Sequence, residues 1–123
     1  PYIVPMNFGY ENEVFYFHCA GEGLKLDLLR KDNRVCVEID ESSPLQKDSA
    51  ANPCSWGVNY YSVIASGTAN FLTNTSDKIK GLELILSQFV GKDFPPMSEK
   101  AIEATTVIAV NIDEITAKQS SEE

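Results

Sequence analysis

The sequence PYIVPMNFGYENEVFYFHCAGEGLKLDLLRKDNRVCVEID, residues 1–40, decides the fold. Alternating apolar side chains over residues 2–8 and an aromatic run over residues 14–18 predict two strands, because side chains of a strand point to its two faces in turn. The turn-forming residues 9–13 between them predict an antiparallel hairpin. The prolines in the first of these strands place it at a sheet edge, since proline cannot donate to the ladder.

A short basic helix and a third strand follow the hairpin. Two glycines lead into residues 24–31, where Asp27 and Lys31 are spaced to form a favourable i, i+4 pair. Residues 34–39 then carry β-branched side chains at alternating positions, which predicts a central strand of the sheet.

The middle of the chain contains a loop and the longest predicted strand. Residues 40–57 are rich in Ser, Pro, Asn and Asp without periodicity, so we expect a long loop. Residues 60–72 alternate as a strand does, and Gly67 within them predicts a bulge or a sharp bend.

The last third of the chain combines helix and strand. Apolar spacing predicts a helix that Thr75 or Ser76 caps and that Gly91 ends. A weaker helix is expected over residues 98–104, and residues 106–115 alternate as a closing strand.

These elements predict one domain of the α+β class, mainly β. About five mostly antiparallel strands with short helices fit a small barrel with outer helices better than a sandwich or a doubly wound sheet. We expect the domain to cover residues 1–117, to lack its natural N-terminal segment, and to be followed by a disordered acidic tail over residues 118–123. At 123 residues, a sizeable cofactor would need a partner subunit, so we expect a homodimer.

Composition limits the class of function. Ten Lys and Arg against eighteen Asp and Glu give a formal net charge of -8, which repels nucleic acid and anionic lipid. No apolar run approaches the ~20 residues of a membrane span. The three cysteines fit neither a zinc pattern nor a paired disulfide framework, so we expect reduced thiols, a cytoplasmic protein, no metal site, and no nucleic-acid or membrane partner.

Two features could carry chemistry. Lys25, Arg30, Lys31 and Arg34 gather beside the glycine-rich turn at a helix start, either as a phosphate site or as the solvated face of an ordinary helix. His18 is the only histidine and lies at a strand end, either in a structural role or as a hydrogen-bond donor and proton shuttle.

Hydrolase and nucleotide-binding motifs are absent from the sequence. It contains no Gly-x-Ser-x-Gly, P-loop or Rossmann signature. Cys19 is next to His18, but neighbours on a strand point to opposite faces, which argues against a nucleophile and its base. The aromatic cluster of Trp56, Tyr60 and Tyr61 either stacks on a planar ligand or belongs to the core or a dimer interface.

Taken together, several motifs resemble the FMN-binding split barrels related to pyridoxamine 5'-phosphate oxidase. The nearest branch is the nitroimidazole-resistance (Nim-type) flavoproteins. The motifs are PYIVPMNFGY at residues 1–10, YFH at residues 16–18, Gly23-x-Lys25, YSVI at residues 61–64 and IDEI at residues 112–115.

The resemblance implies a Greek-key split β-barrel that forms homodimers and binds FMN at the subunit interface. By the same resemblance, Lys25 binds the FMN phosphate, and Ser62 approaches the flavin from the other subunit. His18 is the candidate catalytic residue. The isoalloxazine would be lined by Val4, Pro5, Met6 and Asn7, and that wall would continue through Tyr16, Phe17 and His18.

The chain departs from the oxidases in two respects. Leu24 stands where they carry an arginine before the phosphate-binding lysine, so phosphate affinity would draw on Arg30, Arg34, turn amides or the missing N-terminal segment. No set of basic residues suits pyridoxal phosphate, so vitamin B6 oxidation is not expected.

The function that the resemblance implies is FMN-dependent electron transfer to a small planar acceptor, with a nitro compound as the candidate. The alternative is a flavin-binding carrier or redox sensor without turnover, and a purely structural protein also stays open. An open cavity faced by His18 would favour the enzyme, whereas a flavin ring covered by Trp56 or residues 42–57 would favour the sensor.

Overall fold

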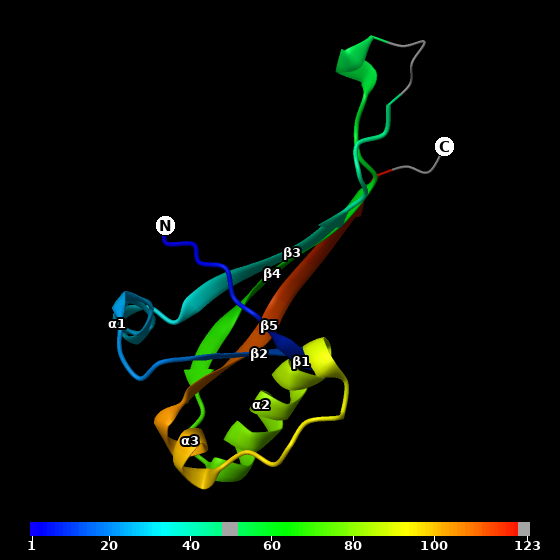
Figure 1. The fold of residues 1–123 in the computed structure, drawn as a ribbon. Coiled ribbons are helices and arrows are strands. Elements are labelled where there is room, and N and C mark those ends of the chain that lie inside the picture. The colour runs from blue at the N-terminus through cyan, green and yellow to red at the C-terminus, as the bar shows by residue number, and fades with distance from the viewer. Residues whose placement is uncertain (48–51, 121–123) are drawn as a thin grey trace.

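The computed structural model describes residues 1–47 and 52–120 (Figure 1). Within these ranges the chain forms one five-stranded antiparallel sheet with strand order β1-β2-β5-β4-β3. The elements are β1 (Gly9–Glu11), β2 (Val14–Cys19), α1 (Leu24–Lys31), β3 (Arg34–Ser42), the 3-10 turn η1 (Pro53–Ser55), β4 (Tyr60–Phe71), α2 (Thr75–Val90), α3 (Glu99–Ala104) and β5 (Thr106–Gln119). The predicted class, α+β and mainly β, is confirmed. Since β1 and β3 are the two edges of the sheet and do not pair within the described ranges, closure of a barrel stays a prediction.

The predicted hairpin is present, but it begins later than expected. Its register starts at the pair of Gly9 with Tyr16, and its turn consists of Asn12 and Glu13, which have φ angles of 50° and 63°. Positive φ at both turn residues is typical of the tightest hairpin loops. The predicted strand over residues 2–8 is wrong, because that segment enters no ladder and contributes instead through Phe8, which packs into the core.

The third strand was expected in the centre of the sheet, and this expectation is wrong. β3 pairs only with β4 and forms an edge, because the long β5 returns between β2 and β4. β3 also runs to Ser42, further than the predicted end at residue 39. The long loop over residues 40–57 is therefore shorter at its start, and it contains η1 and a bridge between Gln46 and Gly57.

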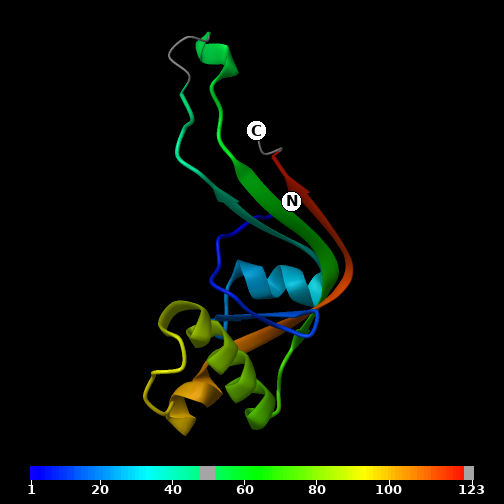
Figure 2. The same cartoon turned by 90° about the vertical axis from the view of Figure 1, so that its right-hand side faces the viewer.

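The predicted irregularity at Gly67 is confirmed. The register of β4 with β5 shifts between Ser66 and Gly67, which leaves Asp113 as an extra residue on β5. A Cβ atom at Gly67 would lie only 2.2 Å from the backbone oxygen of Asn111, so the strands approach too closely here for any other residue. Figure 2 shows the sheet curving strongly, and a bulge is a common cause of such a bend.

Beyond the bulge, the outer parts of three strands project from the body of the molecule. We call residues 38–42 of β3, 60–66 of β4 and 114–119 of β5 the arm, and residues 43–47 and 52–59 lie at its tip (Figure 1). β5 continues through Gln119, beyond the domain boundary predicted at residue 117, so Lys118 and Gln119 belong to the sheet. Residues 121–123 of the predicted disordered tail lie outside the described residues.

Helix ends follow local side-chain chemistry. Asn74, rather than Thr75 or Ser76, caps α2, because its side-chain oxygen accepts from the backbone N–H of Ser76 at 2.8 Å. Gly91 ends that helix with a φ of 67°, as predicted. Ser98 caps α3 in the same way as Asn74 caps α2.

The sheet has two covered faces. On the first, which we call the α1 face, Leu26 of α1 is only 1% exposed and packs with Phe15, Ala69 and Val110. On the second, the α2 face, Val107 of β5 is fully buried against side chains of α2 and α3. Apolar burial on both faces therefore holds the two helical layers to the sheet.

Candidate functional site

The start of α1 is the first part of the candidate site. Gly23 occupies the cap position with a φ of 142°, a backbone that side chains rarely adopt, and no side chain caps the first-turn amides. Lys25 lies in that first turn, is half-buried, and makes no ion pair with any residue of the described ranges. Free amides, the positive end of the helix and an unpaired ammonium group together suit a phosphate.

The other basic residues of the predicted cluster are differently placed. Arg34 forms a two-point ion pair with Asp32 at 3.0 and 2.7 Å, which lowers the pKa of Asp32 to about 2 and raises the pKa of Arg34. Arg30 lies 3.7 Å from Asp27, in place of the predicted pair of Asp27 with Lys31, and stacks over a phenylalanine ring. The two arginines that could replace the missing oxidase arginine are therefore already engaged with carboxylates.

The segment predicted to line a flavin ring leads onto the α1 face. Phe8, at its end, makes an edge-to-face contact with Phe15 at 5.8 Å between ring centroids. Val4, Pro5 and Asn7 are exposed, and Met6 is half-buried. In Figures 1 and 2 this segment is drawn as an extended blue trace before β1. Its backbone is therefore open to a ligand.

Tyr16, Phe17 and His18 of β2 do not all lie on the same face of the sheet. Phe17 packs into the core of the α1 face. Tyr16 lies against α2, where a Cβ at Gly81 would come within 2.9 Å of its ring, and His18 lines a hollow of the same α2 face. In a single chain the structure thus does not bring Tyr16 and His18 onto the face where Phe17 and Phe8 pack.

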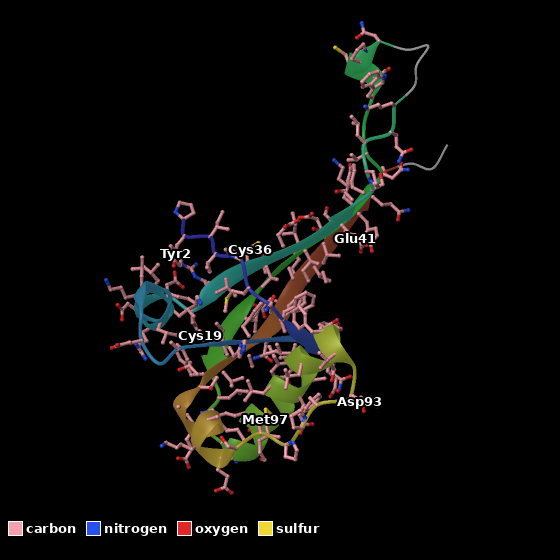
Figure 3. The ribbon with its side chains drawn as sticks, in the orientation of Figure 1. Tyr2, Cys19, Cys36, Glu41, Asp93 and Met97 are labelled. Atoms are coloured by element: carbon pink, nitrogen blue, oxygen red, sulfur yellow. The ribbon has the colours of Figure 1, made fainter. Side chains whose placement is uncertain are left out.

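His18 opens into a hollow of about 200 Å³ between β2, α2 and α3, which we call the His18 hollow. Figure 3 labels Met97 on the segment that joins α2 to α3. The other lining residues are Leu82, Ile85, Leu86, Ala101, Ile102 and Thr105. These residues could not be recognised as a site from the sequence, because the helical spacing of the leucines and isoleucine indicates only a core face.

Ser62 lies on β4, far from the end of the strand that is near α1. It is half-buried on the arm and pairs in register with Asp40 of β3 and Lys118 of β5. Thr68, six residues further along β4, pairs with Arg34 just after α1, so Ser62 is about 20 Å along the strand from that point. The structure does not bring Ser62 to Lys25 within one chain.

Carboxylates on the arm perturb one another and a tyrosine. A side-chain hydrogen bond with Asp40 raises the pKa of Glu38. Tyr61 donates a short hydrogen bond to Glu41, and this bond raises the pKa of the tyrosine. The outer end of the arm is thus acidic and polar beside its exposed apolar side chains.

The described ranges contain no gathering of three or more His, Cys, Asp or Glu side chains of the kind that holds a metal ion. None of their helices has the length and apolar character of a membrane span.

Comparison with known proteins gives a family match and several structural relatives. The family described as pyridoxamine 5'-phosphate oxidase matches residues 1–119. No curated protein matches the chain. The structure of a proposed 5-nitroimidazole antibiotic resistance protein from Bacteroides thetaiotaomicron is 32% identical, has a TM-score of 0.82, and is matched over 95% of this chain and 68% of that one.

Two more distant structures share the fold. The flavocytochrome Anf3 from Azotobacter vinelandii has a TM-score of 0.80 at 22% identity, over 99% of this chain and 57% of that one. The FAD and heme binding protein from Mycobacterium smegmatis has a TM-score of 0.79 at 17% identity, over 97% of this chain and 59% of that one. The chain thus spans less than two thirds of these two proteins.

Proposed function

The chain belongs to the pyridoxamine 5'-phosphate oxidase family, and from this premise we propose that it is a flavoprotein that passes electrons from reduced FMN to a small planar acceptor. The similarity to a proposed 5-nitroimidazole antibiotic resistance protein makes a nitro compound the first acceptor to test. FMN, when bound, supplies the redox chemistry, and the protein binds and orients it.

The observation that carries the proposal is the uncapped start of α1 with Lys25 beside it. In a chain of net charge -8, an unpaired and half-buried lysine needs an anionic partner more than a surface lysine does. We assign the phosphate of FMN to Lys25 and the first-turn amides after Gly23. Leu26, buried in the core, holds this turn of helix in place.

We assign the other predicted roles to a homodimer. The backbone of residues 4–7, with Phe17 beside it, would line the ring on the α1 face. Tyr16 and His18 face the opposite side, and Ser62 of the partner subunit would complete the site. Exposed apolar side chains on the arm, Tyr61 at 54% and Ile115 at 53%, support an interface with a second copy.

By the resemblance, His18 would hydrogen-bond the acceptor and deliver a proton to it. Because His18 faces the α2 side of its own sheet, this role is assigned to the homodimer and not to the flavin site of a single chain. His18 is exposed, lines an open hollow, and makes no hydrogen bond within the described ranges. The sensor alternative requires Trp56 or the loop between β3 and β4 to cover the ring. In Figure 1 the described parts of that loop, residues 43–47 and 52–59, lie at the tip of the arm, away from α1 and α2, so within one chain they do not cover the proposed ring site.

The first experiment is the visible spectrum of the purified protein and the mass of any released chromophore. A flavin spectrum with FMN released supports the proposal. Release of FAD would mean that the cofactor is FAD and not FMN, and FAD is tested because one fold relative is described as an FAD and heme binding protein and another as a flavocytochrome. A colourless protein that takes up neither added flavin refutes it.

A variant pair tests the phosphate assignment. Lys25→Met should weaken FMN binding about ten- to a hundredfold, the value of a hydrogen bond to a charged group, and leave riboflavin binding unchanged because riboflavin lacks the phosphate. Lys31→Met, at the other end of the same helix, is the matched control and should bind both flavins normally. Equal losses for the two flavins, or for the two variants, would contradict a phosphate role for Lys25.

The role of His18 has its own readout. His18→Ala should retain FMN and slow reoxidation of the reduced flavin by a nitro acceptor by about a hundredfold or more, the usual range for a general acid. Unchanged reoxidation would remove His18 from the reaction.

A further inference from the structure

The His18 hollow is an apolar pocket with one polar group that has no partner. Side chains of Leu82, Ile85, Leu86, Met97 and Ile102 form most of its wall. Thr105 also lines it, but its hydroxyl already donates to the carbonyl of Ala101 at 2.7 Å. His18 makes no hydrogen bond or ion pair within the described ranges, so its imidazole is available to a ligand.

The size and polarity of the hollow define what fits. A cavity of 150 Å³ lined by apolar side chains is large enough for benzene, so about 200 Å³ accommodates one ring or a small fused pair. An imidazole can donate or accept one hydrogen bond. His18 is the only titratable side chain among the lining residues, so the lining offers no carboxylate, lysine or arginine to pair with a charged ligand.

We propose that the His18 hollow binds a small uncharged aromatic molecule whose single oxygen or nitrogen substituent hydrogen-bonds to His18. Apolar walls with one fixed polar group are the usual composition of a small-molecule site. The inference shares His18 with the proposed function but goes beyond it, because the hollow lies on the α2 face, is formed by one chain, and is lined by no other residue assigned to the flavin.

The two methionines of the chain allow a direct test. Met97 lines the hollow, whereas Met6 belongs to the segment assigned to the flavin, so methyl-labelled methionine gives one NMR signal for each site. Phenol is the probe, and toluene, which replaces the hydroxyl with a methyl group, is the comparison ligand. Phenol should shift Met97 and leave Met6 in place, and toluene should bind about two- to tenfold more weakly because it lacks the hydrogen bond.

Variants separate occupancy of the hollow from binding elsewhere. Ala101→Leu fills the hollow from α3 and should abolish the shift of Met97, whereas Ala104→Leu, exposed on the same helix but outside the hollow, should leave the shift intact. His18→Leu should remove the preference for phenol over toluene. Retention of that preference would overturn the role of His18.

Three other outcomes would overturn the proposal. They are no shift of Met97 at millimolar phenol, equal shifts of Met97 and Met6, and a Met97 signal that changes with protein concentration alone, which would mean that a second copy covers the hollow. Flavin uptake is measured separately on the same samples. A Met97 response without flavin uptake supports ligand binding in the His18 hollow and refutes the flavoprotein proposal. Flavin uptake without a Met97 response refutes only ligand binding in the hollow.

Discussion

Replacement of Gly67 by alanine should strongly destabilise the fold. The added Cβ would lie 2.2 Å from the backbone oxygen of Asn111 and 3.0 Å from a methyl group of Val110. An ordinary contact between carbon and oxygen is about 3.3 Å, so β4 and β5 would have to separate by roughly 1 Å at the bulge. The obstacle is backbone within a ladder and cannot rotate away, which places the cost near the upper end for overpacking, about 3 kcal/mol.

The assay is thermal unfolding without flavin at one protein concentration, because a bound ligand or a dimer would itself raise Tm. A cost of about 3 kcal/mol lowers Tm by roughly 10 °C in a domain of this size. Gly21→Ala is the matched control, since a Cβ there meets nothing within 4 Å. It should change stability by less than about 1 kcal/mol. If Gly67→Ala melts within a degree or two of the parent chain, β4 and β5 tolerate a side chain at the bulge, and the predicted steric conflict is refuted.

Three further predictions concern elements that hold the site. Asn74→Ala should lower the free energy of unfolding by about 1 kcal/mol through loss of the α2 cap. An unchanged urea midpoint would show that Asn74 is not the stabilising cap of α2. Leu26→Ala should cost about 2–5 kcal/mol, whereas Leu24→Ala, at a position 57% exposed, should cost little in the same titration. The pair with Arg34 holds the pKa of Asp32 at about 2, so its stabilising contribution is present above pH 4 and is lost as the pH falls towards 2. Asp32→Asn should be less stable than the parent at pH 6 and equally stable near pH 2, and a pH-independent difference in urea midpoint would contradict the pairing.

Local patterns predicted the helices and the long strands because each has a signal within its own residues. The bounds of α1 were predicted correctly, and the bulge at Gly67 followed from one glycine in an alternating strand. The position of β3 in the sheet could not be predicted in this way. It depends on where β5 inserts, and that insertion is a contact between segments far apart in the sequence.

The candidate site shows the same division between local and long-range information. Lys25 beside an uncapped helix start could be predicted, because the glycine turn and the lysine are neighbours in the sequence. The separation of Phe17 from His18 was implicit in strand alternation, but the resemblance placed both on one wall. The His18 hollow could not be predicted, since it requires β2, α2 and α3 to meet.

The charge distribution is compatible with the phosphate site proposed at α1, although the chain is acidic. At a net charge of -8 the protein repels anions at long range, but at physiological salt that repulsion is screened beyond about 8 Å. Within that distance the balance depends on pairing, and Arg30 and Arg34 are each offset by a neighbouring aspartate. In the proposed site, the unpaired Lys25 and the free amides of α1 would provide the net attraction. Phosphate affinity in this chain should therefore come from direct contacts at one helix turn rather than from a basic surface, which is why a single lysine is the decisive position.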